Sequence, residues 1–255
     1  MKTNTPMKTK ITSLITAGIL GATIASHGAT IVYQSDFTGT TVGEAGLTST
    51  GTASGIWNID TANDRLNANF PVGNARATVK NIGGFQSDLL TLDVTFNQLA
   101  TSAKFSIGLF EIGPDWNNGN DFIQDSTANK PYSIGFSTDG ALEDANGNND
   151  VLSFYNGSTV SKLSDAQGDI SFNTLQTFSL TITSDSWSYS LNGAPATTGT
   201  TSFDMSKSYG FVAYGHNAPM NGSYITNITI SVPEPSSTAL LGLGGLALAL
   251  RRRRA

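Results

Sequence analysis

The stretch Leu90-Thr-Leu-Asp-Val-Thr-Phe96 decides the fold, because its apolar and polar residues alternate strictly. The same alternation runs through Phe178-Ser-Leu-Thr-Ile-Thr183 and, after the short turn Ser184-Asp-Ser186, through Trp187-Ser-Tyr-Ser-Leu191. Period two with β-branched and aromatic residues predicts strands with one buried and one solvated face. Further strands are predicted at residues 30–34, 75–82, 105–109, 132–136, 151–155, 209–214 and 228–232.

Between the two ends of the chain, no segment shows a helical period longer than two turns. Three dipeptides, Asp139-Gly140, Asn156-Gly157 and Asn192-Gly193, are typical of tight hairpin turns. Ten or more strands without helices between them predict an all-β domain, a jelly-roll β-sandwich of two antiparallel sheets. No linker interrupts the pattern before Pro233, so one domain is expected over residues 30–232.

The C-terminus has a different composition. Pro233-Glu-Pro235 precedes an apolar run at 236–250, which ends in the block Arg251, Arg252, Arg253 and Arg254. As a helix this run reaches about 22 Å, short of a bilayer core of about 30 Å. The arginines resist translocation, so everything upstream of them is placed outside the cytoplasm.

This order of parts resembles the PEP-CTERM sorting signal of exported bacterial proteins, which the membrane protease exosortase reads. The resemblance implies that Pro233, Glu234 and Pro235 form the recognition motif of a signal spanning 233–255. It also implies a short, transient transmembrane helix at 237–250 and a stop-transfer role for the arginines. An ordinary tail anchor is the alternative. The resemblance describes delivery and says nothing about activity.

The N-terminus predicts a secretory signal peptide over residues 1–29, and this signal peptide is expected to form a helix. Lys2, Lys8 and Lys10 precede the apolar stretch 11–24, and small residues follow it. Cleavage is expected after Gly28 or Ala29 by signal peptidase. With a signal at each end, the chain is expected to be exported and then handled at the inner membrane.

The mature domain is more acidic than the whole chain, whose formal net charge is −5. Leader and tail hold seven of the 14 basic residues but only one of the 19 acidic ones, so 30–232 carries about −11. Such a surface argues against nucleic acid as a partner and suits an extracellular life or divalent cations. The absence of cysteine excludes disulfides, thiolate catalysis and thiolate metal sites.

Three short segments carry a second resemblance. The opening at 31–37, the hairpin at 187–193 and the glycine-flanked Gly210-Phe-Val-Ala-Tyr-Gly215 resemble a concanavalin A-like (laminin-G-like) jelly roll. Such folds commonly bind or cut carbohydrate, but a fold alone does not assign an activity.

Catalytic residues are hard to find. A glycosidase needs two carboxylates about 5–9 Å apart, and no strand places two glutamates or aspartates on one face with that pattern. Glu111, paired with Asp115 or Asp121, is the one candidate, and a solvated residue at a strand end is the favoured interpretation of it. The single mature histidine, His216, is interpreted as a locally bonded loop residue.

Two loops are candidate ligand sites. In one of them, side chains with oxygen atoms stand at alternate positions, Asp144, Asn146, Asn148 and Asp150. Loops that bind Ca²⁺ use this spacing. The pattern departs from that of an EF-hand, and it also suits an ordinary turn. In the other, an indole among amides could stack on a sugar, or could instead cap the sandwich; its residues are Trp116, Asn117 and Asn118. Trp57 and Trp187 lie in strand-like contexts and are predicted core residues.

The sequence therefore predicts a non-catalytic, exported protein of the cell surface or extracellular matrix. Extracellular polysaccharide is the expected partner, and membrane contact is expected only through the C-terminal segment until it is processed. A carbohydrate-active hydrolase or lyase is one alternative, and a carboxylate pair at glycosidase distance would favour it. A purely structural matrix protein is the other.

Overall fold

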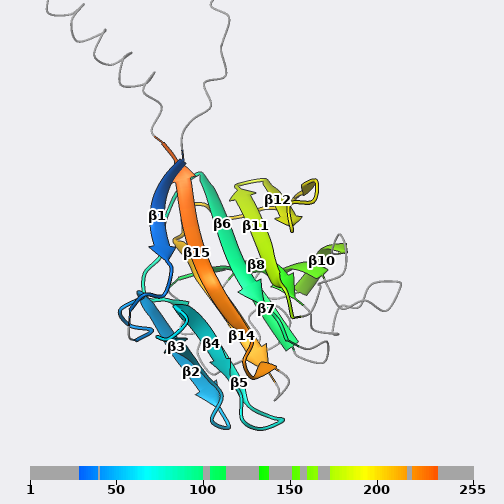
Figure 1. The fold of residues 1–255 in the computed structure, drawn as a ribbon. Coiled ribbons are helices and arrows are strands. Elements are labelled where there is room, and N and C mark those ends of the chain that lie inside the picture. Colours follow the sequence, from blue (N-terminus) through cyan, green and yellow to red (C-terminus); the bar gives the residue numbers. More distant parts are fainter. Residues whose placement is uncertain are drawn as a thin grey trace, which may run out of the picture.

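The computed structural model describes residues 29–39, 41–99, 104–112, 132–137, 151–155, 160–165, 173–216 and 220–234. They form two antiparallel sheets (Figure 1). Sheet A has eight strands: β1 (Ala29–Ser35), β3 (Ile56–Asp60), β4 (Arg65–Asn69), β6 (Leu89–Asn97), β11 (Leu175–Thr183), β12 (Ser186–Leu191), β13 (Thr197–Thr200) and β15 (Tyr224–Pro233). Sheet B has seven: β2 (Leu47–Thr52), β5 (Arg76–Asn81), β7 (Lys104–Glu111), β8 (Ser133–Ser137), β9 (Val151–Tyr155), β10 (Val160–Asp165) and β14 (Tyr209–His216).

Many strands that are adjacent in a sheet are not consecutive in the sequence. Sheet A runs β13-β12-β11-β6-β15-β4-β3, and β1 adds to the C-terminal half of β15, on the side where β4 pairs with its N-terminal half. Sheet B runs β10-β9-β8-β7-β14-β5-β2. The first and last described strands are therefore hydrogen-bonded partners, so the start of β1 and the end of β15 lie side by side (Figure 1).

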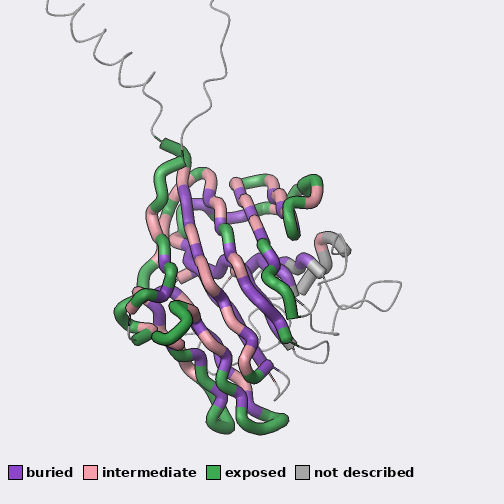
Figure 2. The backbone as a smooth tube through the Cα atoms, in the orientation of Figure 1, coloured by how far each residue is buried: buried purple, intermediate pink, exposed green. Residues whose placement is uncertain are grey.

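The core lies between the sheets and follows the alternation of the sequence. Along β6, Leu90, Leu92, Val94 and Phe96 are buried, and the residues between them face outward. Buried and partly exposed residues alternate in the same way along the other central strands of sheet A (Figure 2). The predicted two-sheet sandwich is confirmed.

Trp57 links the two sheets. Its ring is fully buried against Phe70 and Phe105, and its indole N–H donates to the carbonyl of Ala77 in β5 at 3.2 Å. Trp187 is also buried, so both tryptophans are core residues, as predicted.

Every strand predicted from the alternation is present, and five further strands were not predicted. β2 reads Leu-Thr-Ser-Thr-Gly-Thr and has one large apolar residue, while β3 and β4 have five residues each. Two apolar positions on one face are too few to establish a period. β10 has two apolar residues three positions apart, and β13 has none. β1 and β15 each extend one residue beyond the expected domain, to Ala29 and Pro233.

The turn predicted at Asn192-Gly193 is confirmed. Both residues have positive φ, 53° and 72°, and the Ala194 N–H donates to the carbonyl of Leu191 at 3.0 Å. The other two predicted turns and both terminal helices lie outside the described residues. Within the described part of the chain, no helix is long and apolar enough to cross a membrane.

Candidate functional site

The outer face of sheet B carries a mixture of polar, aromatic, aliphatic and cationic residues. Strand register places Thr48, Lys80, Val212 and Gly108 side by side across β2, β5, β14 and β7. The next row holds Thr50, Thr78, Tyr214 and Ser106. Hydroxyls, rings, glycines and a cation therefore share this surface.

A second apolar cluster lies on this outer face, separate from the core between the sheets. The side chains of Phe110, Val212 and Tyr214 are at most 3% exposed, and Ile112 packs against them. β14 is consequently buried at every position except its last residue, which explains why its sequence lacks a polar alternation. Both the inner and the outer face of β14 are therefore shielded from solvent, as in a strand that is buried on both sides.

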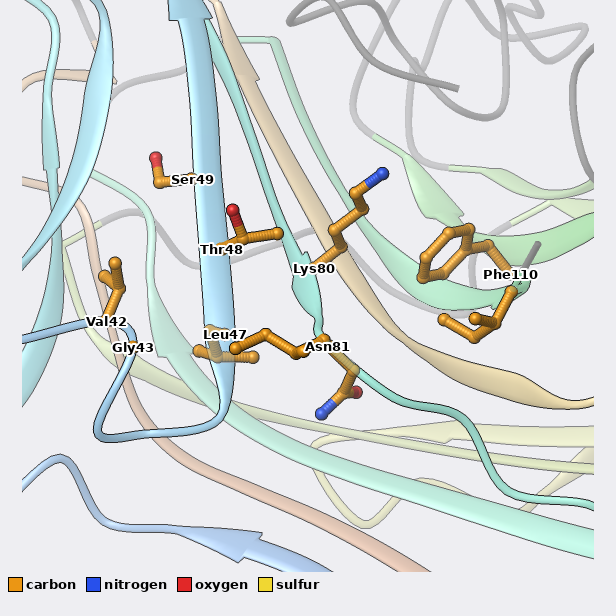
Figure 3. Close-up of a pocket in the computed structure, with 10 residues that line it drawn as sticks. Val42, Gly43, Leu47, Thr48, Ser49, Lys80, Asn81 and Phe110 are labelled. Atoms are coloured by element: carbon orange, nitrogen blue, oxygen red, sulfur yellow. The ribbon is translucent and has the colours of Figure 1, made fainter. Parts of the chain in front are cut away.

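A groove of about 610 Å³ opens beside this cluster (Figure 3). Its apolar residues include Ile82, which is 62% exposed, and the ring of Phe110. The Lys80 ammonium lies 5.8 Å from the centre of that ring, within cation–π range. The complete lining consists of Val42, Gly43, Leu47, Thr48, Ser49, Lys80, Asn81, Ile82, Phe110 and Ile112.

One wall of the groove is a braced turn at residues 41–46. The Glu44 carboxylate accepts the Thr41 N–H at 3.0 Å, and the Thr41 hydroxyl accepts the Glu44 N–H at 3.2 Å, the reciprocal arrangement of a capping box. Tyr33 donates its hydroxyl hydrogen to the carbonyl of Ala45 at 2.7 Å. Burial raises the pKa of Tyr33 to about 12, so this phenol stays neutral and keeps donating.

The described lining of the groove contains apolar surface, two hydroxyl-bearing residues, an amide and one cation, but no carboxylate. General acid–base hydrolysis of a glycosidic bond needs two carboxyl groups, and this lining supplies neither. No group of three or more His, Asp or Glu residues that could hold a metal ion is found among the described residues.

Glu111 is held in place. Its carboxylate lies 3.2 Å from the Lys207 ammonium, accepts the Tyr132 N–H at 3.4 Å, and is 7% exposed. The expectation of a solvated strand-end residue is therefore wrong, because register with Tyr209 turns this last residue of β7 toward the interior. Its two candidate partners, Asp115 and Asp121, lie outside the described residues.

His216 is the last residue of β14, not a loop residue. It pairs across the sheet with Arg76 and Lys104, and its ring lies 6.3 Å from that of Tyr214. The local Gly-His-Asn-Ala-Pro sequence suggested a turn, but pairing on both sides extends the strand to this position.

The two loops predicted to bind ligands lie outside the described residues, at 116–118 and 144–150. The groove was not predicted, because its residues come from a turn and three strands that the sequence does not place together. One signal was present: Gly210–Gly215 contains no charged residue and little polarity on either face. That pattern indicates a strand covered on both sides.

Solved structures with the same architecture share little sequence with this chain. The Emp46p carbohydrate recognition domain in its potassium-bound form has a TM-score of 0.57 and 12% identity, and covers 76% of this chain and 93% of its own. The VIP36 exoplasmic/lumenal domain bound to Ca²⁺ and Man3GlcNAc has a TM-score of 0.55 and 9% identity, over 83% and 94%.

A Bacillus subtilis protein described as having a galectin-like fold has a TM-score of 0.57 and 12% identity, over 82% of this chain and 99% of its own. No curated protein matches this chain. These likenesses establish the lectin-type, concanavalin A-like sandwich fold. At such identities they establish the fold alone.

The C-terminus gives a specific match. Residues 231–254 fit the family described as the PEP-CTERM protein-sorting motif. The chain ends in a PEP-CTERM sorting signal. This PEP-CTERM motif indicates an exported protein that is processed at its C-terminus. Pro233 and Glu234, both exposed, stand at the end of β15, while Pro235 and the arginine block lie outside the described residues.

Proposed function

We propose that this protein is a non-catalytic glycan-binding or adhesive protein, delivered by exosortase to the cell surface or extracellular matrix. The groove on the outer face of sheet B is its binding site, and extracellular polysaccharide is its partner. Signal peptidase removes residues 1–29, and the C-terminal segment contacts the membrane until processing.

The observation that carries this proposal is the composition of the groove. A sugar ring presents an apolar C–H face and a rim of hydroxyls, so its site needs apolar surface beside hydrogen-bonding groups. Exposed Ile82 supplies apolar surface, and Thr48 and Lys80 supply polar contacts from adjacent strands. Carbohydrate recognition domains among the structures of the same fold support the same reading.

The positions of the carboxylates also support a glycan-binding role without catalysis. The carboxylate of Glu111 is engaged by Lys207 and the Tyr132 N–H, and the described groove lining has no carboxylate. Calcium remains part of the proposal through the loop Asp144–Asp150, whose alternating oxygen side chains suit Ca²⁺.

Glycan-array binding of the exported protein, measured with and without Ca²⁺, tests the proposal. We expect binding, and we expect Ile82→Asp to weaken it about tenfold or more, because the charge replaces apolar contact area. Val72→Asp is the matched control: Val72 is 45% exposed, apolar and outside the groove lining.

Silence of the wild-type protein under both calcium conditions would contradict glycan binding. Equal loss in Ile82→Asp and Val72→Asp would show that the effect is not local. Loss of binding in Trp116→Ala with retention in Ile82→Asp would move the site to the loop 116–118.

A further inference from the structure

The sorting signal and the folded domain overlap in sequence. The matched motif begins at Ser231, yet Ser231, Val232 and Pro233 belong to strand β15. Ser231 is 8% exposed, and Val232 packs against the core. The first residues of the signal are therefore part of the sandwich.

Their strand partners differ along β15. From Ile228 to Ser231, each residue pairs with β6 on one side and with β1 on the other. The register gives Val232 and Pro233 partners only in β1, namely Thr30 and Ala29. β1 thus provides the whole of the strand pairing at the start of the recognition motif.

Among the described strands, β1 pairs with β15 alone. Val32 and Tyr33 pack against the core, but Ala29, Thr30 and Ile31 are exposed, Ile31 by 54%. The first three residues of β1 are therefore held by sheet pairing rather than by burial. Local opening of such a segment needs less free energy than global unfolding.

Pairing decides which peptide bonds a protease can reach. Cleavage inside a paired strand waits for that strand to open, and its rate follows the population of the open form. With β1 in place, exposed Glu234 is the first described residue beyond the paired segment.

We propose that β1 sets the C-terminal processing boundary of this protein. While β1 is paired, Thr30 protects Val232, and the tail is cut on the C-terminal side of Val232. In that cut water adds to the carbonyl carbon, the C–N bond breaks, the domain keeps a carboxylate and the tail leaves with an amino group. When β1 is released, Val232 loses its strand pairing and cuts move upstream to it, while Ile228 to Ser231 stay paired with β6.

The same geometry joins the two ends of the protein. Leader removal is predicted after Gly28 or Ala29, and Ala29 is the partner of Pro233. Both processing sites therefore meet at one row of the sheet. This inference relies on the sorting role of the tail and is independent of glycan binding.

Full-length Ile31→Pro, produced in cells that export and process the chain, tests the proposal. Proline lacks the N–H donor and is tolerated poorly within paired strands. Ile56→Pro is the matched control, because Ile56 is also an exposed isoleucine in an edge strand of sheet A. Intact mass of the released protein reports both termini, and digestion with proteinase K reports accessibility without the sorting machinery.

We expect wild type and Ile56→Pro to end at Val232 or later. We expect Ile31→Pro to be cut at the Ser231–Val232 bond about tenfold faster, because the opened population controls cleavage. Ile31→Gly, which keeps the N–H donor, should give a smaller shift in the same direction.

Identical C-terminal cut positions in wild type, Ile31→Pro and Ile31→Gly would overturn the proposal. Unfolding of Ile31→Pro, seen by circular dichroism, would leave Ile31→Gly as the deciding variant. Unshifted cuts together with retained glycan binding would refute the role of β1 without touching the proposed function.

Discussion

The two outer faces of the sandwich differ more than the two inner ones. On sheet A, the outward positions of β11 and β12 after Leu175 are serines and threonines that remain at least partly exposed. On sheet B, the corresponding positions of β14 and β7 include Val212, Tyr214 and Phe110, which are buried, and Gly108, which has no side chain. β11 and β12 of sheet A therefore have one buried and one partly solvated face, whereas β14 of sheet B is buried on both faces.

This difference separates a solvated surface from a candidate binding surface. Hydroxyls on sheet A bond to one another, as Thr91 and Thr181 do at 3.0 Å between their oxygens. Sheet B instead has the buried outer cluster of Phe110, Val212 and Tyr214 with the groove beside it. Substitutions at outward positions should therefore be tolerated on sheet A and costly on sheet B.

The largest expected effect is at Gly108. A Cβ there would lie 2.1 Å from the carbonyl oxygen of Ile134 and 2.6 Å from the Cα of Gly135 in β8, so the strands would have to separate. We expect Gly108→Ala to lower the free energy of unfolding by about 3 kcal/mol. Ser179→Val, at an outward position of β11, should change it by less than about 0.5 kcal/mol.

Urea denaturation of both variants measures this difference. Equal stability of Gly108→Ala and wild type would show that the close approach of β7 and β8 does not constrain sheet B.

A smaller effect is expected at Val212. Truncation to Ala removes two methyl groups from the outer cluster, where the side chain is fully buried, and should cost about 2 kcal/mol. Ser188→Ala, on the outer face of sheet A, should cost less than about 0.5 kcal/mol. Thermal unfolding by calorimetry distinguishes them, and matching melting temperatures would remove the distinction between the faces.

The smallest effect concerns pH. Burial raises the pKa of Tyr33 from 10.0 to about 12. Because the neutral phenol is favoured in the folded state, its contribution is complete below pH 10 and is lost as the pH rises from about 10 to 12. Tyr33→Phe should lose about 1 kcal/mol at neutral pH with the hydrogen bond to Ala45, and should show a weaker alkaline decline.

Asp60, at the turn between β3 and β4, should respond at the other end of the pH scale. Hydrogen bonds from Asn63 and then Arg65 lower the pKa of Asp60, so its contribution exists above pH 4 and fades as the pH falls through the lowered value. Asp60→Asn should flatten the acid side of the stability curve and leave the alkaline side unchanged. An alkaline response in Asp60→Asn would contradict this division.

The strands with the clearest alternation, β6, β7, β11, β12 and β15, have three or more large apolar residues on one face. Alternation failed for β2, whose single Leu47 gives no period, and for β3 and β4, whose buried pairs are too short. It also misjudged Glu111 and His216, because pairing with neighbouring strands decides which way a strand-end residue faces. The groove could not be predicted at all, since Val42, Lys80 and Phe110 are separated by many residues and meet only in the sheet.

The sequence by itself determined the sandwich, its core tryptophans and the sorting signal at residues 231–254, because each depends on a local order of residue types. Tertiary structure decided everything that depends on which strands are neighbours. Register buried the outer face of β14, opened a groove between the 41–46 turn and the strands beside it, and paired Ala29 with Pro233. A pattern with period two states which residues share a face, but only strand order states what that face meets.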